Sequence, residues 1–172
     1  MNRYSRLKLH AFGDASELAY ALAVYLRAVS SDGHICTRLV MSKSRIASVV
    51  KRVTLPRLEL MAAVITPRLW TYVRNVLDCK IGRINCWTHN SSTLHWIRSS
   101  LSRWKPFIAN RVTEIQALLD PSVWRYCPGS ENPADLTTKK MSAKELEESQ
   151  LWWEGPTWLR SPEGKWPFDL RS

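Results

Sequence analysis

An almost uninterrupted apolar run from Ala19 to Val29 is the feature of this sequence that most restricts its fold. A strand that is apolar on both faces belongs in the interior of a sheet that is covered on both sides. The longest wholly apolar stretch, Leu18 to Leu26, is much shorter than the ~20 residues that a membrane-spanning helix needs. We therefore expect a buried central strand and no membrane partner.

Two further strand patterns flank this run. Before it, Leu7, Leu9 and Ala11 recur at every second position up to Gly13-Asp14, which is typical of a strand that ends in a turn. After it, Ser31-Asp32-Gly33 favours a hairpin turn, and residues 35–41 alternate again. The three segments together predict an antiparallel meander.

The hydrophobic pattern becomes helical after Lys51. Apolar residues recur at helical spacing from Leu58 to Val76, and Pro56 suits the first turn of such a helix. Pro67 lies in the interior, where it removes a backbone donor and should kink the helix at a cost of about 3 kcal/mol. The kink is expected to leave the first two turns unaffected.

Strands and helices continue to alternate in the middle of the chain. Residues 82–88 and 122–127 predict strands, and residues 108–119 predict a helix. A shorter helix is expected to end at Arg98, with Asn90 as its N-cap. The later strands need helical crossovers and should therefore lie parallel to the first, which makes the fold α/β.

The C-terminal third has two helix start signals and then a change of composition. Asn132-Pro133 is one start signal, and a capping box beginning at Ser142 is the other. From Leu151 onward, tryptophans stand among prolines and glycines. We predict one domain over residues 7–149, with residues 150–172 forming a tail that folds against it or connects it to another domain.

The strong positive charge points to an anionic partner. Lys and Arg number 25 against 15 Asp and Glu, so the formal net charge is +10 and the pI is near 9.8. Nucleic acid is the usual partner of such a surface, although a basic face that is simply solvated is the alternative. The candidate phosphate-binding residues form two clusters: Lys43, Arg45, Lys51, Arg52 and Arg57, and then Arg98, Arg103, Lys105 and Arg111, the latter interleaved with Trp96 and Trp104.

The cysteines argue against a thiolate zinc site and for a reducing compartment. None of Cys36, Cys79, Cys86 and Cys127 belongs to a C-x-x-C pair. Three of them fall in strand-like segments, where buried thiols act as small hydrophobic residues. We therefore expect an intracellular location, without choosing between cytoplasm and nucleus.

Three carboxylates stand where an α/β sheet could bring them together. Asp14 follows the first strand, Glu59 lies early in the long helix, and Asp135 opens a later helix. Two divalent metal ions held by such carboxylates can cleave a phosphodiester, and Mg²⁺ prefers oxygen ligands. Each residue also has a simpler reading, as a turn Asp, a solvated Glu near a helix N-terminus and a capping residue respectively.

Motifs from Leu9 to Leu159 make the chain resemble the ribonuclease H-like domain of Pao/BEL-type retrotransposon Pol polyproteins. The stretches that carry the resemblance are Phe12-Gly13-Asp14-Ala15-Ser16, Ser42-Lys43-Ser44-Arg45, Leu55-Pro56-Arg57-Leu58-Glu59-Leu60, Trp87-Thr88, Trp96-Ile97, Arg103-Trp104, Ala109-Asn110-Arg111-Val112, Pro128-Gly129, Asn132-Pro133-Ala134-Asp135-Leu136 and Leu151-Trp152-Trp153-Gly155-Pro156.

The resemblance implies a five-stranded mixed sheet, with three antiparallel strands and then two parallel ones, flanked by helices. It implies an endonuclease that hydrolyses the RNA strand of an RNA–DNA hybrid with two Mg²⁺, or Mn²⁺, held by four acidic residues. By motif, Asp14, Glu59 and Asp135 are the first, second and fourth of these metal ligands. The implied protein partners are the reverse transcriptase and integrase regions of the parent polyprotein.

His89 departs from this pattern, because the third acidic residue should follow Trp87-Thr88. An imidazole removes one negative charge from a site that must hold two dications, and it suits Zn²⁺ or Mn²⁺ better than Mg²⁺. We expect a loss of several kcal/mol of transition-state stabilisation, roughly a thousandfold in rate. We therefore predict a domain that binds hybrid but is catalytically crippled.

Two other hypotheses remain open. The chain could be a working hybrid nuclease that tolerates His89 through another metal or a substitute carboxylate. It could instead be a non-catalytic module that contacts proteins through exposed tryptophans. Hybrid binding and protein contact differ in salt dependence, since an affinity that rests on phosphate contacts falls steeply as the salt concentration rises.

Overall fold

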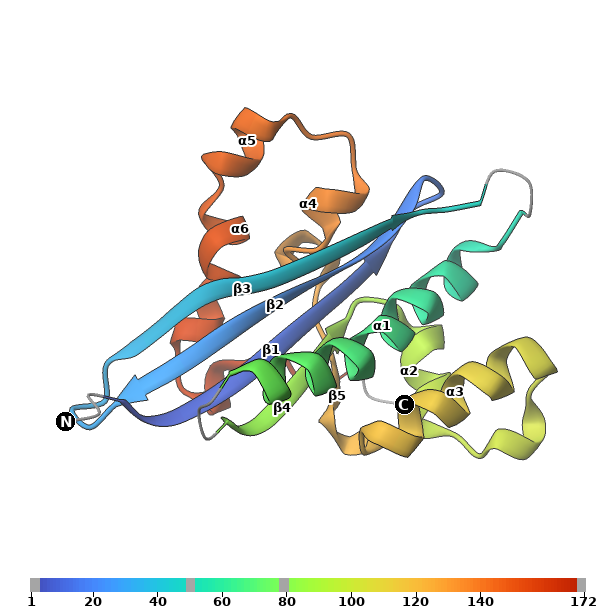
Figure 1. Cartoon of the computed structure of the whole chain (residues 1–172), viewed down its shortest axis with the longest axis horizontal. Helices are drawn as coiled ribbons and strands as arrows, with labels where there is room; N and C mark the ends of the chain where they lie inside the picture. The colour runs from blue at the N-terminus through green and yellow to red at the C-terminus, as the bar shows by residue number, and fades with distance from the viewer. Residues whose placement is uncertain (1–3, 49–51, 78–80, 170–172) are drawn as a thin grey trace.

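The computed structural model describes residues 4–48, 52–77 and 81–169 as an α/β fold around one sheet (Figure 1). The five strands, in the order β3-β2-β1-β4-β5, are β1 (Tyr4–Ala15), β2 (Ala19–Ser30), β3 (Ile35–Ile46), β4 (Ile81–Thr88) and β5 (Trp124–Tyr126). β1, β2 and β3 pair antiparallel, whereas β4 pairs parallel to β1 and β5 parallel to β4. This mixed five-stranded sheet confirms the predicted fold class.

The apolar run forms β2, the second strand from the β3 edge of the sheet. Its residues are buried almost throughout, as expected for a strand covered on both faces. The turn that follows contains Gly33 at a φ of 87°, a backbone conformation that glycine adopts without the steric cost a Cβ brings. β1 begins three residues before the predicted pattern and β3 ends five residues after it, whereas β2 ends at Ser30, one residue past the apolar run.

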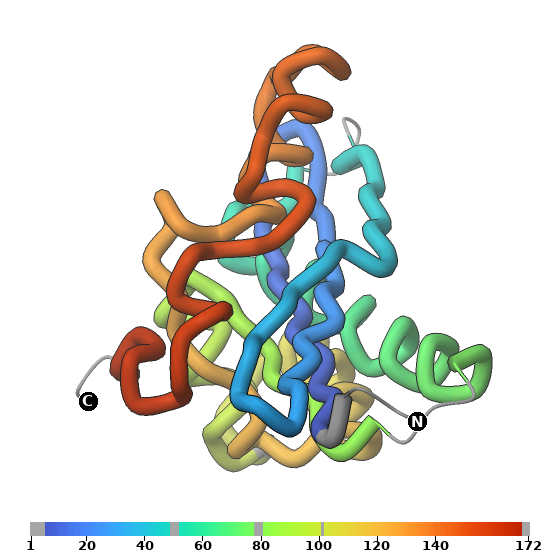
Figure 2. The backbone as a smooth tube through the Cα atoms, turned by 90° about the vertical axis from the view of Figure 1, so that its left-hand side faces the viewer, coloured from blue at the N-terminus to red at the C-terminus, as the bar shows by residue number. Residues whose placement is uncertain are grey.

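Helices cover both faces of the sheet (Figures 1 and 2). One face carries α1 (Leu55–Val76), α2 (Ser91–Arg98) and α3 (Pro106–Leu118), and α1 contacts β1 and β2 directly. The other face carries α4 (Asp135–Thr138), α5 (Ala143–Glu147) and α6 (Gln150–Glu154). Short 3-10 turns lie between these elements at Leu101–Arg103, Pro121–Val123 and Gly129–Glu131, and two more follow α6 at Thr157–Arg160 and Glu163–Lys165.

Most of the predicted helix starts are found in the structure. Asn90 caps α2 by accepting a hydrogen bond of 2.8 Å from the Thr93 backbone N–H, and Ser142 begins a complete capping box at α5. The start predicted at Asn132 is wrong, because α4 begins three residues later, at Asp135. The Asn132 side chain is used for other contacts, which lie beside the candidate site.

Helix α1 runs without interruption through Pro67. It carries its first proline, Pro56, in the first turn, where a missing backbone donor costs little. The hydroxyl of Thr71 donates to the Pro67 carbonyl, one turn earlier in the helix. The helix therefore accommodates Pro67 within one continuous element, and Glu59 lies two turns before it.

Two apolar cores lie on opposite faces of the sheet. The larger lies under α1, α2 and α3 and includes Leu9, Leu60 and Ile115. The smaller contains the aromatic side chains and C-terminal residues Phe12, Tyr25, Trp87, Trp152, Leu159 and Trp166. Residues 150–169 thus pack on the sheet, as Figure 2 shows for the red end of the chain. The domain boundary at residue 149 stays a prediction.

Two further predictions concerned the cysteines and the membrane. Among the described residues, Cys86 and Cys127 are buried free thiols and Cys36 is a half-buried one, whereas Cys79 lies outside the described ranges. Within the same ranges, no helix has the length and apolar character needed to cross a bilayer.

Candidate metal centre and basic surface

Asp14 and His89 are neighbours because their strands are parallel. Phe12 of β1 lies opposite Trp87 of β4, so two further residues along each chain bring Asp14 beside His89. The carboxyl ends of parallel strands are where α/β sheets collect functional side chains. The Asp14 side chain is buried, while that of His89 keeps one third of its surface exposed.

Glu59 reaches the same point from α1, which packs across β1. It lies early in the helix, next to the buried Leu58 and Leu60, and its own exposure is only 2%. Neither of its carboxylate oxygens has an aligned hydrogen-bond partner among the described residues. Burial is costly for a carboxylate, and the His89 imidazole and the Ala15 backbone N–H are the neighbours that favour its ionised form.

The imidazole of His89 lies between the two carboxylates. Its Nδ1 is 3.1 Å from Asp14 Oδ1, and its Nε2 is 3.4 Å from Glu59 Oε1. The first contact is short enough for an ion pair but is not aligned as a hydrogen bond. One donor atom from each of the three residues lies within 4.8 Å of the others, so the three can hold a metal ion.

Neighbouring groups fix these side chains in place. The Thr138 hydroxyl donates to Asp14 Oδ2, and the hydroxyl of Ser16 donates to the Thr138 carbonyl at 2.7 Å. The Asn132 amide donates to the Gly13 carbonyl at 2.8 Å, while its oxygen accepts from the Ala134 backbone N–H at 3.1 Å. The loop after β5 is thereby tied to the end of β1.

The loop also backs the imidazole ring itself. A Cβ added to Gly129 would lie 3.7 Å from ring carbons of His89, in ordinary van der Waals contact. Gly129 therefore lies next to the imidazole ring, whose two nitrogens face the two carboxylates.

Asp135 lies near this cluster but does not belong to the three-donor group. Its carboxylate pairs with Lys139 one helical turn later. Its charge still reaches the site, because it contributes to the pKa values of both Glu59 and His89. Among the described residues, the structure thus brings three of the four predicted ligands together and places the fourth beside them with a cationic partner.

The electrostatics of the cluster follow from burial and proximity. Burial, helped by the charge of Asp14 and opposed by His89, raises the pKa of Glu59 to about 8. The Asp14 carboxylate raises the pKa of His89, and burial opposes that shift. Both shifts favour a cluster whose negative charge is partly neutralised by its own protons.

The two basic clusters meet around Phe107. The guanidinium carbons of Arg57 and Arg111 lie 4.8 Å and 3.5 Å from the centre of its ring. Burial lowers the pKa of Arg111, and the nearby charge of Arg57 lowers it further. Two like charges are therefore held close together by an aromatic ring, which is a suitable arrangement for an anion.

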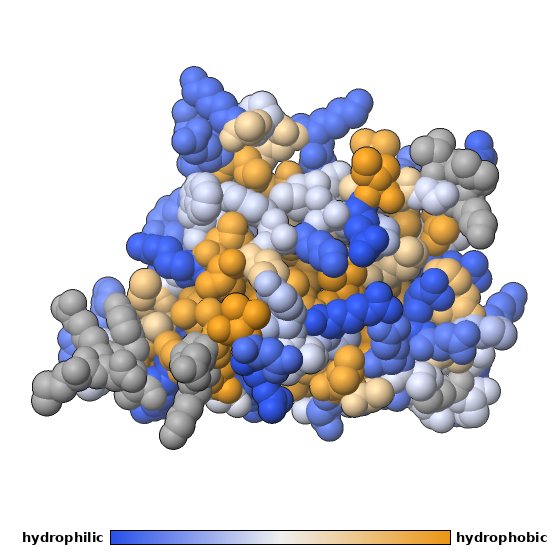
Figure 3. Space-filling view, viewed as in Figure 1, coloured by the Kyte–Doolittle hydropathy of each residue, from blue (hydrophilic) through white to orange (hydrophobic). Residues whose placement is uncertain are grey.

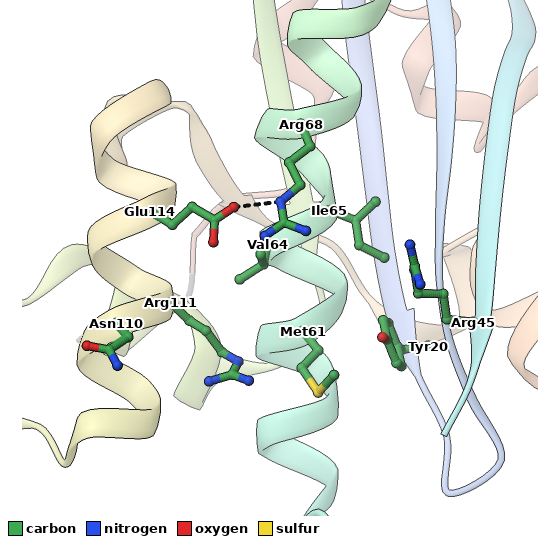
Figure 4. A pocket seen from close by; sticks show the side chains of 9 residues that line it. All are labelled: Tyr20, Arg45, Met61, Val64, Ile65, Arg68, Asn110, Arg111 and Glu114. Carbon is green, nitrogen blue, oxygen red and sulfur yellow. Dashed lines mark hydrogen bonds and ion pairs between the residues drawn. The ribbon is translucent and has the colours of Figure 1, made fainter. Parts of the chain in front are cut away.

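A surface hollow of about 390 Å³ adjoins this pair, between α1, α3 and the outer strands (Figure 4). Arg68 on its rim is bound to Glu114, with 2.6 Å between Nε and Oε1. Arg45 and Arg111 project toward the hollow from opposite sides. The face of the molecule drawn in Figure 3 shows hydrophobic residues near its centre with hydrophilic residues around them.

The other predicted phosphate-binding residues differ in their contacts and in how far their side chains are exposed to solvent. Arg98 donates to the Trp124 carbonyl at 2.6 Å and to Asp169 at 2.8 Å, so it supports the fold as well as the surface. Lys51 lies outside the described residues. The side chains exposed to solvent are those of Lys43, Arg45, Arg52, Arg103 and Lys105.

Sequence reasoning missed three residues that shape the site. Thr138 and Lys139 stand three and four positions after Asp135, a spacing that places them on the same side of one helical turn. Phe107 stands four before Arg111, which is the spacing of an aromatic–arginine pair on a helix. Both spacings are visible in the sequence, but neither shows which distant residues Thr138, Lys139 or Phe107 would contact.

The model of the family described as Pao retrotransposon-like RNaseH-like domain matches residues 1–90. Among solved structures, an N-terminal RNase H domain from Mycobacterium tuberculosis, fused to maltose-binding protein, is 11% identical with a TM-score of 0.43, covering 74% of this chain and 85% of that one. RNase H1 from Halobacterium salinarum is 15% identical with a TM-score of 0.38, covering 72% and 86%.

A third similar structure is LC11-RNase H1 in complex with RNA/DNA hybrid, which is 11% identical with a TM-score of 0.44. The match covers 74% of this chain and 88% of that one. No match was found among curated proteins.

Proposed function

The chain belongs to the Pao retrotransposon-like RNaseH-like domain family, and from that membership we propose that it binds RNA–DNA hybrid while its Mg²⁺-dependent cleavage is strongly impaired. In this proposal Asp14, Glu59 and Asp135 are the remaining acidic residues of a four-ligand catalytic site. His89 occupies the position of the missing one. The observation that carries the proposal is the contact of both His89 ring nitrogens with carboxylates of that site.

The donor atoms do not fit a pair of Mg²⁺ ions. Mg²⁺ demands oxygen ligands in nearly ideal octahedral geometry, and an imidazole supplies a nitrogen instead. Asp14 and Glu59 together offer two negative charges, and the charge of Asp135 is already balanced by Lys139. Two adjacent dications would therefore be poorly neutralised, which supports a loss of roughly a thousandfold in cleavage rate.

Binding has separate support from the basic surface. Arg57 and Arg111 project from different helices onto one aromatic ring, and Arg45 lies across the adjoining hollow. Guanidinium groups recognise phosphate oxygens through charge and paired hydrogen bonds, without reading the base sequence. Since these groups lie outside the three-donor cluster, hybrid binding can outlast the loss of cleavage.

The test compares the natural chain with His89→Asp on a labelled RNA–DNA hybrid in Mg²⁺ and in Mn²⁺. The natural chain should bind the hybrid in the presence of a chelator and should leave it uncut in Mg²⁺. His89→Asp should cut the RNA strand. The double variant His89→Asp with Glu59→Gln should be silent, which excludes a contaminating nuclease.

Each other outcome has a definite meaning. Equal cleavage by the natural chain and His89→Asp would show a working nuclease and would overturn the impairment. Absence of hybrid binding at low salt by the folded natural chain would overturn the binding role and favour a protein-contact module.

A further inference from the structure

We propose that the outer edge of β3, from Met41 to Ile46, pairs with an extended segment of another protein that carries acidic residues at alternate positions and an apolar residue in line with them. β3 ends the sheet on one side, so within the described part of the chain no strand lies beyond it (Figure 1). The inference is independent of the proposed function, because it uses neither the cluster around His89 nor the contact of Arg57 and Arg111 with Phe107.

Other parts of the two edge strands are occupied by the chain itself. α6 packs against the first half of β3, where the Thr37 hydroxyl donates to the Glu154 carbonyl at 2.6 Å. At the opposite edge, the Asp169 carboxylate accepts from the Tyr126 backbone N–H of β5 at 3.0 Å. Every residue from Ser42 to Ile46 is exposed instead. An exposed edge of this kind is a template for one more strand.

The pairing with β2 shows which backbone groups of this segment face outward. The Ala47 N–H donates to the Leu18 carbonyl at 2.8 Å, on the β2 side. Backbone groups in an antiparallel pair point to the two sides of a strand alternately, so those of Arg45 and Lys43 also point toward β2. The residues whose N–H and C=O groups point away from β2 are Ser42, Ser44 and Ile46.

These outward groups favour a peptide over nucleic acid. They present N–H donors and C=O acceptors in alternation, and the edge of a second strand matches both kinds. Phosphate oxygens only accept, so a nucleic acid backbone would leave the outward carbonyls of β3 without donors.

The side chains of the segment define the charge of the partner. Met41–Ile46 contains Lys43 and Arg45 but no acidic residue. These two cations alternate with Ser44, so they share one face of β3, and residues of opposite charge across from them on an added strand would be stabilising. They were predicted above to bind phosphate; here they pair with carboxylates. A second copy of the segment would bring like charges together instead.

A surface hollow of about 330 Å³ lies on the same face, between β3 and α1. Apolar side chains that line it are those of Met41, Ile65, Leu69 and Tyr72. Tyr72 is also exposed to solvent. Because alternate side chains of a strand share a face, an added strand that directs acidic residues toward Lys43 and Arg45 would direct the next in line into this hollow.

The probe is a fluorescein-labelled synthetic peptide of about seven residues, in which threonine and valine alternate with two glutamates and a leucine. Fluorescence anisotropy measures its affinity for the full chain. Ser44→Pro removes an outward N–H while leaving the bonds to β2, and should weaken binding about 10-fold. Ser44→Thr keeps that N–H and should bind as the natural chain does. Lys43→Glu should weaken binding about 5-fold and favour a peptide with lysine in place of glutamate.

A second measurement leaves the protein unchanged. The peptide is N-methylated on one or the other alternate set of its amides, and only the set that faces β3 should abolish binding. Thermal melting shows whether each protein variant is folded.

Peptide affinity that is equal in folded Ser44→Pro and the natural chain, or that is lost equally with both methylated peptides, overturns the proposal. So does a folded natural chain that does not bind the peptide. If Ser44→Pro weakens hybrid binding as strongly as peptide binding, the edge belongs to nucleic acid. If Ser44→Pro dissociates a dimer of the natural chain in analytical ultracentrifugation, the edge belongs to a second copy. Either result overturns the assignment to another protein.

Discussion

Asp14 and His89 end two neighbouring parallel strands, and 3.1 Å separates the carboxylate oxygen of the first from the imidazole nitrogen of the second. The position that would complete an acidic metal site is therefore filled by a side chain able to pair with that site's own carboxylates. This arrangement has a consequence for stability as well as for catalysis.

We expect His89→Asp to destabilise the metal-free protein. The change places a new carboxylate beside that of Asp14, and two like charges about 4 Å apart repel by several kcal/mol at an effective dielectric constant near 20. Chemical denaturation in chelator should show a loss of roughly 2 kcal/mol or more, and adding Mg²⁺ should restore much of it. His89→Asn should lose less and gain nothing from Mg²⁺; equal losses in the two variants would contradict the repulsion.

We expect Arg57→Ala and Arg111→Ala each to weaken hybrid binding and to reduce its salt dependence. Every phosphate contact that is lost removes about one unit from the slope of log affinity against log salt. Fluorescence anisotropy at several salt concentrations measures this slope. Arg74→Ala, at the far end of α1, is the matched control and should leave the slope unchanged.

We expect His10 to lower the free energy of unfolding below about pH 6.5, against the opposite contribution of Glu59, whose raised pKa stabilises the fold as the pH falls below about 8. Burial, with neighbouring cationic side chains adding to it, holds the pKa of His10 well below its usual range. The unfolded chain takes up a proton near pH 6.5 that the folded chain refuses, so acid favours unfolding, by up to ~1.4 kcal/mol per pH unit.

Denaturation curves between pH 5 and pH 8 test this expectation. His10→Gln keeps an oxygen that can accept from Trp87 Nε1, as His10 Nδ1 does at 3.1 Å. It should lose the His10 contribution, so that its stability rises relative to the natural chain as the pH falls. His34→Gln, at an exposed position, should retain it. A slope unchanged by His10→Gln would assign the acid sensitivity to another group.

We expect Gly155→Ala to destabilise the fold by about 1–3 kcal/mol, because its backbone lies in a region that is essentially restricted to glycine. Gly155 has φ 73° and ψ −176°, and an added Cβ would lie 3.1 Å from Leu159 and 3.5 Å from Tyr25. Thermal melting measures the effect. Gly164→Ala, where an added Cβ meets nothing within 4 Å, should be neutral.

Local sequence patterns predicted the sheet and the positions of Asp14 and His89, because strand ends are visible in alternation and turn residues. The same patterns could place Glu59 early in a helix, but its burial depends on how α1 crosses β1. The order of the motifs alone assigned Asp135 to the metal site. Its pairing with Lys139, one helical turn later, was therefore missed.

The contacts that join distant segments were beyond local reasoning. Nothing in the periodicity around Trp166 indicates that it meets the ring of His10 edge-on, with 5.1 Å between centroids. In the same way, Arg57 and Arg111 belong to separate clusters in the sequence and become neighbours only when α1 packs on α3. Such encounters depend on the tertiary arrangement, which periodicity does not encode.

The smaller, aromatic core packs C-terminal residues against Phe12 and Tyr25, and this restricts the order in which the chain can fold. The Arg27 guanidinium bonds to the Leu159 carbonyl at 2.8 Å, across 132 residues, and Lys8 pairs with Glu163 across 155. Contacts of such long range form late and slow folding. A chain emerging from the ribosome therefore leaves Phe12 and Tyr25 uncovered until Trp152 and Trp166 have been made, and exposed apolar surface of this kind favours aggregation.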